Sequence, residues 1–76
     1  MVVVTTVYTK PACVQCEMTK KYMDKNGIEY TTVDITKNQE AFDMVIGMGF
    51  QSAPVVISEV GNWSGFQPDK INLLAA

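Results

Sequence analysis

Short runs of apolar and β-branched residues recur along the chain and predict strands. The first run, VVVTTVY at residues 2–8, shows little polar alternation, which is typical of a strand buried on both faces of a sheet. The run YTTVDI predicts a second strand at residues 30–35, and APVVISEV predicts a third at residues 53–60. Gly61-Asn62 is a tight-turn signal, so we expect residues 62–64 to pair back on the third strand as a hairpin.

The segments between these runs have the spacing of apolar residues that predicts helices. The first helix is predicted over residues 17–25, with Gly27 just past its end. Thr36 and Gln39 have the spacing of a capping box ahead of a second helix, and Pro68 suits the first position of a third. The residues expected on the inner faces are Met18, Tyr22 and Met23 in the first helix, Phe42, Val45 and Ile46 in the second, and Ile71 and Leu74 in the third.

These elements follow one another in the order β-α-β-α-β-β-α. That order predicts an α/β fold in which helices flank a central four-stranded mixed sheet. The chain has 76 residues, which suits a single domain over residues 1–76. Because 47% of the residues are hydrophobic, such a domain can build its core without a metal or a disulfide framework.

Composition and charge exclude several classes of function. The net charge of −2 and the sequence pI of about 4.8 argue against a nucleic-acid binder, which normally carries a basic face. No apolar stretch approaches the roughly 20 residues that cross a bilayer, and the apolar start lacks the basic region and cleavage site of a signal peptide. We therefore expect a cytoplasmic protein with no membrane partner, in a compartment where thiols are kept reduced and structural disulfides are rare.

The two cysteines, Cys13 and Cys16, stand in the run CVQC where the first strand gives way to the first helix. At a helix N-terminus the free N–H groups and the helix dipole favour an anion, so we expect the pKa of the Cys13 thiol to fall below about 8.5. Lys10 could attract an incoming anionic group or lower this pKa further, or it could be an ordinary solvated lysine. Cys16 should lie one turn further in and be less exposed. This asymmetry suits dithiol–disulfide exchange, in which the outer thiolate attacks and the inner thiol resolves the mixed disulfide.

Other uses of two cysteines fit the sequence less well. A zinc site usually needs four ligands, and this chain has two cysteines and no histidine, so it would need a second copy or borrowed ligands. A structural disulfide across so short a loop would constrain the unfolded chain little. An inert pair of core cysteines is the simplest alternative. The C-x-x-C spacing beside a βαβ pattern favours redox chemistry over all three.

Three segments together carry a resemblance to a known family. They are YTKPACVQC at the first strand–helix junction, APVV at the start of the third strand, and WSGFQPD before the last helix. In these segments the chain resembles the NrdH-redoxin family of the thioredoxin superfamily, which comprises glutaredoxin-like electron donors to class Ib ribonucleotide reductase. The likeness runs from about Val4 to Leu74 and implies a thioredoxin fold.

The resemblance also implies roles for individual residues. Cys13 would be the attacking cysteine and Cys16 the resolving one. Pro54, which follows Ala53, would be a cis-proline that faces the disulfide and aligns an incoming strand of the partner. From the residues alone, Pro54 is equally well explained as a proline that begins a strand.

The family further implies a reductant and partners. Thioredoxin reductase, using NADPH, would re-reduce the protein in place of glutathione, and the large subunit of class Ib ribonucleotide reductase would be the protein substrate. The protein would bind no cofactor and no metal and would act as a monomer. Two other functions stay open: a glutathione-dependent glutaredoxin, and a module that shares a metal or an iron–sulfur cluster between two copies through Cys13.

Two departures from glutathione-using glutaredoxins favour the first hypothesis. Those proteins usually have a Gly-Gly pair followed by an acidic residue near the last helix, and an aromatic residue inside CPYC. Here Trp63-Ser64-Gly65-Phe66 and Val14-Gln15 stand in these places. We expect Trp63 to lie toward the surface and to form an apolar docking patch with Phe66, although Phe66 suits the core equally well. The residues predicted to bind the partner are Lys10, Val14, Gln15, Ala53, Pro54, Trp63, Ser64, Gly65 and Phe66.

Overall fold

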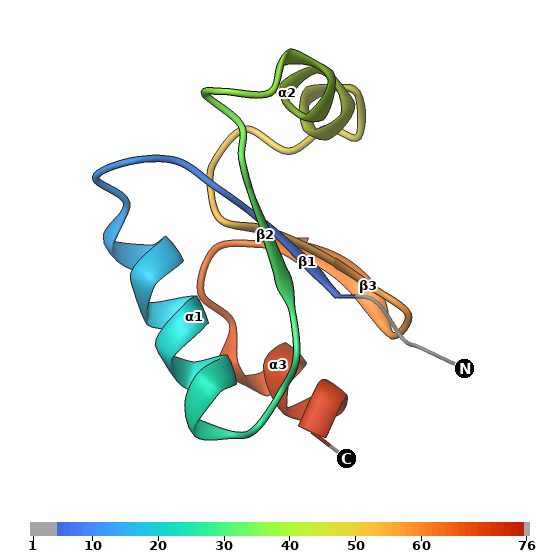
Figure 1. Ribbon diagram of the computed structural model, residues 1–76. Helices are drawn as coiled ribbons and strands as arrows, with labels where there is room; N and C mark the ends of the chain where they lie inside the picture. The colour runs from blue at the N-terminus through green and yellow to red at the C-terminus, as the bar shows by residue number, and fades with distance from the viewer. Residues whose placement is uncertain (1–4, 76) are drawn as a thin grey trace.

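A four-stranded sheet crosses the middle of the molecule in the computed structural model, which describes residues 5–75 (Figure 1). Its strands are β1 (Thr6–Thr9), β2 (Thr31–Asp34), β3 (Val55–Ser58) and β4 (Gly61–Ser64). They lie in the order β2-β1-β3-β4, with β1 parallel to β2 and the other two neighbouring pairs antiparallel. The predicted mixed sheet is therefore confirmed. Residues 2–4 of the predicted first strand lie outside the described residues.

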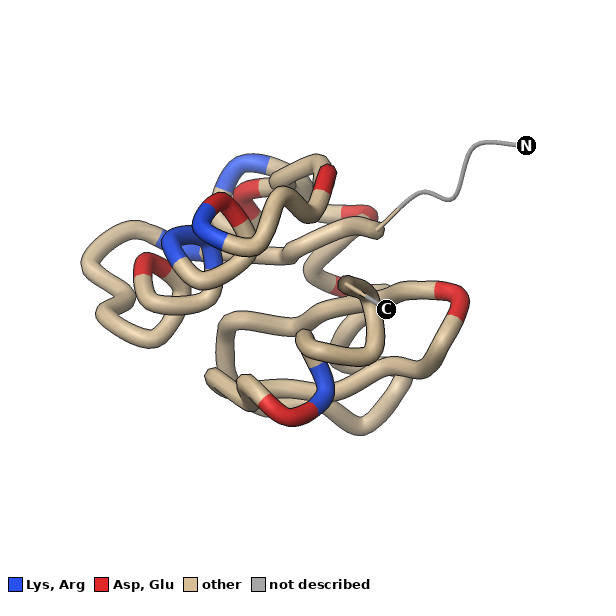
Figure 2. The backbone as a smooth tube through the Cα atoms, turned by 90° about the horizontal axis from the view of Figure 1, so that it is seen from below, with Lys and Arg blue, Asp and Glu red and all other residues tan. Residues whose placement is uncertain are grey.

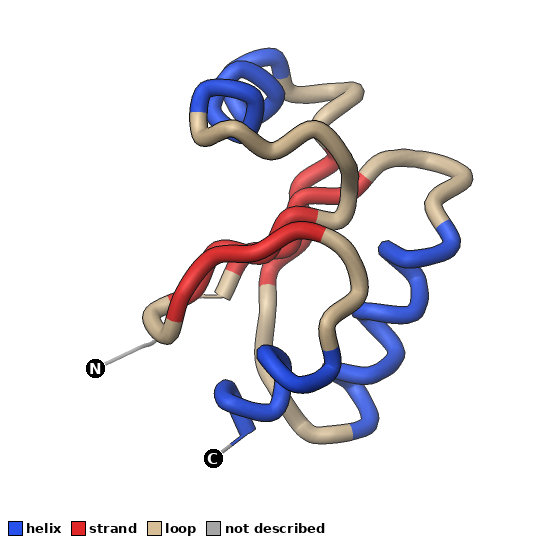
Figure 3. The backbone as a smooth tube through the Cα atoms, turned by 180° about the vertical axis from the view of Figure 1, so that it is seen from behind, coloured by secondary structure: helices blue, strands red, loops and turns tan. Residues whose placement is uncertain are grey.

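Helices cover the sheet from two sides (Figures 1 and 3). The helices α1 (Val14–Lys25) and α3 (Pro68–Ala75) lie together on one side, whereas α2 (Gln39–Gly47) lies on the other. This arrangement confirms the predicted order of elements and the thioredoxin-like fold. Pro68 begins α3 as predicted, at a position where its missing N–H removes no helical hydrogen bond.

A hydrophobic core lies between the sheet and the helices α1 and α3. Val7, Val56 and Trp63 stand opposite one another on β1, β3 and β4, and directly opposed residues point to the same face of a sheet. Met23 from α1 and Ile71 from α3 pack on them, and all five residues are at most 4% exposed. The prediction that Trp63 lies toward the surface is wrong, because its place opposite Val56 directs the ring into this core.

The inner face of α1 differs from the prediction at one position. Met23 is buried and Tyr22 is half-buried, but Met18 is exposed and Thr19 is buried instead. The Thr19 hydroxyl tolerates burial because it donates a hydrogen bond of 2.9 Å to the carbonyl oxygen of Gln15.

The helix α2 covers its side of the sheet less completely than α1 and α3 cover theirs. Its buried residues are Ala41 and Val45, which are one turn apart. Phe42 and Ile46 are 41% and 49% exposed, so the prediction for the inner face of this helix is right for Val45 alone. The helix stands apart from α1 and α3, on the other side of the sheet (Figure 3).

The cap of α2 also differs from the prediction. The side-chain oxygen of Asn38 accepts a hydrogen bond of 3.0 Å from the N–H of Ala41, so Asn38 is the N-cap residue. Thr36 instead donates its N–H and its hydroxyl to Asp34 Oδ1, at 2.8 and 2.6 Å. These two bonds turn the chain after β2, and the hydroxyl bond is the main reason why the pKa of the Asp34 carboxyl is lowered.

The hairpin turn lies two residues before its predicted position. Ser58 on β3 pairs with Gly61 on β4, so residues 59–60 form the turn. Gly61 has a φ of +144°, which suits glycine immediately after a tight turn. Gly61 and Asn62 are therefore the first residues of β4, and the predicted pairing of residues 62–64 with β3 is confirmed.

Candidate functional site

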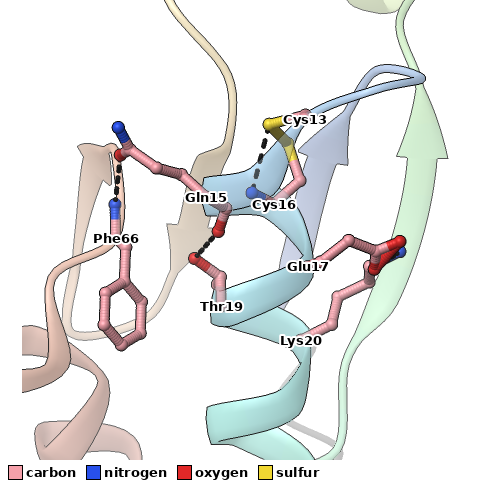
Figure 4. Close-up of a disulfide and its surroundings, with 7 residues drawn as sticks. All are labelled: Cys13, Gln15, Cys16, Glu17, Thr19, Lys20 and Phe66. Carbon is pink, nitrogen blue, oxygen red and sulfur yellow. Dashed lines mark hydrogen bonds and ion pairs between the residues drawn. A yellow bond between two sulfur atoms is a disulfide. The ribbon is translucent and has the colours of Figure 1, made fainter.

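The two cysteines form a disulfide at the start of α1 (Figure 4). Cys13 is the N-cap residue of the helix, and Cys16 lies in its first turn, with 5.2 Å between the two Cα atoms. The N–H of Cys16 donates to Cys13 Sγ at 3.1 Å, so the sulfur takes the place of the capping oxygen found in many helices. The helix consequently begins at Val14 and not at Glu17, and the predicted position of the pair at a strand–helix junction is confirmed.

The two sulfur-bearing residues differ in accessibility. Cys13 is half-buried, whereas Cys16 is 1% exposed, which confirms that Cys16 is the less exposed of the two. An incoming disulfide therefore meets Cys13 first. After reduction, a thiolate at Cys13 would stand beside a main-chain N–H and at the positive end of the helix dipole. Both favour negative charge on this sulfur, which is what an attacking thiolate requires.

The residues between β1 and α1 make a sharp turn just before Cys13. Ala12 has a φ of +57°, a left-handed conformation that residues other than glycine rarely adopt. Cys13 itself is extended, with a φ of −112° and a ψ of 104°. Lys10, earlier in the same segment, is exposed and lines a cavity beside α2. Its predicted action on an incoming anionic group stays a prediction.

The two residues between the cysteines point in different ways. The Val14 side chain is 74% exposed, so it presents an apolar surface next to Cys13. Gln15 is also exposed, but its Oε1 accepts a hydrogen bond of 3.0 Å from the N–H of Phe66, on the loop before α3 (Figure 4). The sequence contained no signal for this contact, because its two residues lie 51 positions apart.

The segment before β3 carries the proline that the family resemblance singles out. The Ala53–Pro54 peptide bond is cis, as the resemblance implies. Pro54 is buried and Ala53 is half-buried. The carbonyl oxygen of Pro54 accepts a hydrogen bond of 2.8 Å from the N–H of Gly65, so this segment is held to the loop that follows β4. That Pro54 faces the disulfide and aligns a partner stays a prediction.

The 64–67 loop, which consists of Ser64 at the end of β4 and the three residues that follow it, packs against both α1 and the cis-proline segment. Gly65 has a φ of +81°, and Gln67 Nε2 donates to the Ser64 carbonyl oxygen at 2.8 Å. The Phe66 ring is half-buried, packs on the core, and meets the Tyr22 ring edge-on, with 5.8 Å between the ring centroids. Because Trp63 is buried, the predicted patch of two aromatic rings is reduced to Phe66.

A cavity of about 360 Å³ lies between α2 and the segment that leads to Pro54. Its lining includes the apolar residues Phe42, Ile46 and Phe50, and also Lys10 and Ala53. Sequence reasoning missed this cavity because it assigned Phe42 and Ile46 to the core. Both side chains are partly exposed and line the cavity.

Charged residues of both signs are interspersed along the described backbone (Figure 2). On α1, Glu17 and Lys20 form an ion pair of 2.9 Å, on the side of the helix away from the Gln15 side chain (Figure 4). Within residues 5–75, no group of three or more His, Cys, Asp or Glu residues is placed to hold a metal ion. In the same part of the chain, no helix is long and apolar enough to cross a membrane.

Comparison with known proteins agrees with this geometry. The glutaredoxin family model matches residues 5–60. The glutaredoxin-like protein NrdH of Escherichia coli (strain K12) is 41% identical over 69 residues, which are 91% of this chain and 85% of that protein. The protein of the same name from Lactococcus lactis subsp. cremoris is 39% identical over 70 residues, which are 92% of this chain and 97% of that protein.

Solved structures show the same likeness. The NrdH-redoxin of Escherichia coli, a glutaredoxin-like protein with a thioredoxin-like activity profile, superposes with a TM-score of 0.91 over 93% of both chains, at 39% identity. A glutaredoxin from Archaeoglobus fulgidus, at 21% identity and a TM-score of 0.74, shares the fold. With a Cys13–Cys16 pair at the start of α1, the chain belongs to the glutaredoxin family and, within it, to the NrdH-type glutaredoxin-like thiol–disulfide oxidoreductases.

Proposed function

We propose that the protein donates electrons to the large subunit of class Ib ribonucleotide reductase and is re-reduced by thioredoxin reductase with NADPH. The observation that carries the proposal is the unequal exposure of the sulfur pair, with Cys13 accessible at the N-cap and Cys16 1% exposed behind it. The likeness to an NrdH-redoxin with a thioredoxin-like activity profile supports a protein as the redox partner. We place this reaction in the cytoplasm, where a dithiol is kept reduced.

The reaction runs in two exchanges. The Cys13 thiolate attacks one sulfur of the partner's disulfide, forms a new S–S bond with it, and displaces the other partner sulfur as a thiolate. Cys16 then loses its proton and attacks Cys13 Sγ, which closes the Cys13–Cys16 disulfide and releases the second partner sulfur. The partner gains two electrons and two protons overall, and the protein dithiol supplies both. Thioredoxin reductase would return the same number from NADPH.

Partner binding would involve the surface around Cys13. In this proposal the apolar Val14 side chain contacts the partner, the Ala53–Pro54 segment aligns its chain, and Lys10 attracts an anionic group. Trp63 supports the site from the core instead of touching the partner, since it is 4% exposed. The loop residues assigned to the contact are Ser64, Gly65 and Phe66. The protein would act as a single domain over residues 1–76, as a monomer and without a bound cofactor or metal.

A recycling assay tests the choice of reductant. Oxidised protein would receive NADPH and thioredoxin reductase in one arm, and NADPH, glutathione and glutathione reductase in the other. We expect rapid NADPH oxidation in the first arm alone, sustained when the oxidised large subunit of class Ib ribonucleotide reductase is added. Turnover mainly in the second arm would identify a glutathione-dependent glutaredoxin. Turnover in neither arm would contradict the redox-carrier role itself.

Replacing Cys16 tests the assignment of the two cysteines. The Cys16→Ser variant, reduced and mixed with a disulfide-bonded protein, should lose nearly all turnover and accumulate as a mixed disulfide, because no second thiol remains to release the partner. Intact mass under non-reducing conditions would detect the adduct. The matched variant Cys13→Ser should form little of it, since Cys16 is buried. A larger adduct yield with Cys13→Ser would reverse the two assignments.

A further inference from the structure

Gln15 links the redox-active turn to the loop that precedes α3 (Figure 4). Its Oε1 accepts the Phe66 N–H at 3.0 Å, and its own carbonyl oxygen accepts the Thr19 hydroxyl at 2.9 Å. An exposed glutamine side chain loses rotamer freedom when it is held in one place. A specific contact to a main-chain group so far away in the sequence therefore points to a purpose beyond local helix structure.

The loop is shaped to receive this amide. A Cβ added at Gly65 would lie 3.2 Å from Gln15 Oε1, so a larger residue at position 65 would crowd the glutamine. The N–H of Gly65 donates to the carbonyl oxygen of Pro54 at 2.8 Å. The loop thus donates two successive N–H groups to its neighbours. The Gly65 N–H binds the cis-proline segment, and the Phe66 N–H binds the Gln15 side chain on α1.

One of these two bonds goes to a main-chain oxygen, that of Pro54, and the other goes to a side-chain oxygen, that of Gln15. If the Gln15 acceptor were removed, the bond from Gly65 to Pro54 would still hold the loop on the cis-proline side. On the α1 side the Phe66 N–H would lose its partner. A protein substrate large enough to lie across Val14 and this loop would meet a less ordered surface, whereas a small disulfide would need only the Cys13 sulfur.

We propose that Gln15 is a positioning residue for protein substrates. It holds the 64–67 loop at the CVQC turn and thereby sets the preference of the site for protein disulfides over small ones. The inference rests on the proposed function only in that the redox partner is a protein. The identity of the reductase does not enter it.

Two substitutions separate the hydrogen bond from the shape of the side chain. Gln15→Met keeps a similar length and removes the acceptor, whereas Gln15→Glu keeps an oxygen within reach of the Phe66 N–H. Lys21→Met places the same new side chain at an exposed position on the same helix and serves as the control. Each protein would be reduced with dithiothreitol, freed of it, and mixed in single-turnover experiments with insulin or with bis(2-hydroxyethyl) disulfide.

For Gln15→Met we expect the half-saturating insulin concentration to rise roughly two- to tenfold, the range that corresponds to one net hydrogen bond. The maximal rate and the rate with the small neutral disulfide should stay at wild-type values. Hydrogen exchange of the Phe66 amide, followed by NMR, should become faster. Lys21→Met should behave as the wild type in all of these measurements, and Gln15→Glu should keep the exchange of the Phe66 amide as slow as in the wild type.

Three results would overturn the proposal. Equal losses with insulin and with the small disulfide would place the effect of Gln15 on the sulfur chemistry. An unchanged half-saturating insulin concentration, with faster exchange at Phe66, would show that the bond has no part in recognition. Exchange of the Phe66 amide as fast in Gln15→Glu as in Gln15→Met would show that the acceptor oxygen is not what holds the loop. Because no reductase is present, each outcome is independent of the recycling assay.

Discussion

Side chains are packed more closely on one side of the sheet than on the other. On the side of α1 and α3, the sheet residues Val7, Val56 and Trp63 are at most 4% exposed, and Met23 and Ile71 cover them completely. On the side of α2, the helix buries two of its own side chains and leaves a cavity of about 360 Å³ next to it.

The more closely packed side of the sheet is the side that carries the two cysteines. The sulfur pair belongs to α1, and exchange between Cys13 and Cys16 requires that their separation be kept while partners come and go. Contacts to α3 and to the loop before it support that helix: Tyr22 donates to Asn72 Oδ1 at 2.8 Å, and its ring packs on Phe66. The α2 side bears neither of the two cysteines, and the exposed apolar residues of α2 make it the region where local opening should cost least. Close packing is therefore found on the side of the sheet where the reaction needs a fixed distance between two sulfurs.

The strongest test of the comparison is a pair of isoleucine truncations. Ile71→Ala, in the core under α3, should lower the free energy of unfolding by about 2–5 kcal/mol, because it leaves a cavity among fully buried side chains. Ile46→Ala, on α2, should lower it by less than about 1 kcal/mol, since that side chain is 49% exposed and alanine favours helix. Urea unfolding of the oxidised proteins measures both. Similar losses would show that the two sides are equally packed.

Substitutions at two glycines test the same difference between the two sides of the sheet. Gly65→Ala should lower the free energy of unfolding by about 1–2 kcal/mol, because Gly65 has a φ of +81° and its new Cβ would crowd Gln15 Oε1. Gly47→Ala, at the end of α2, meets open space and should raise it by up to about 1 kcal/mol through helix propensity. The same unfolding experiment applies. A gain at position 65 or a clear loss at position 47 would contradict the geometry of the respective segment.

The last expected effect appears only at alkaline pH and concerns the α1 side. Burial, together with a hydrogen bond of 2.9 Å to Asp24 on α1, raises the pKa of Tyr30 from 10.0 to about 12. Since the folded-state pKa is the higher one, the stability contributed by the neutral phenol is complete below about pH 10 and is lost as pH rises toward about 12. In Tyr30→Phe the unfolding midpoint in urea should therefore fall less steeply over that pH range. Parallel pH profiles for the two proteins would show that Tyr30 titrates alike in both states.

The order of elements and the position of the cysteine pair were determined by the sequence alone. β-branched runs and helical spacing act over a few residues, so they predicted the strands and helices of the mixed sheet without knowledge of their neighbours. The C-x-x-C spacing at the start of a helix places Cys13 and Cys16 within one helical turn, with Cys16 further along the helix. The lower exposure of Cys16 was therefore also predictable. The family segments pointed to the cis bond before Pro54, which the residues by themselves did not distinguish from an ordinary start of a strand.

Only the tertiary structure decided which apolar residues at the edge of the core are buried and which are exposed. Trp63 became a core residue because β4 pairs with β3 in the register that places it opposite Val56. Phe42 and Ile46 line a cavity because α2 buries Ala41 and Val45 in their place. The bond between Gln15 and Phe66 joins positions 51 residues apart. In each case the local sequence allows several placements, and the choice among them depends on strand register and helix position, which contacts between distant parts of the chain determine.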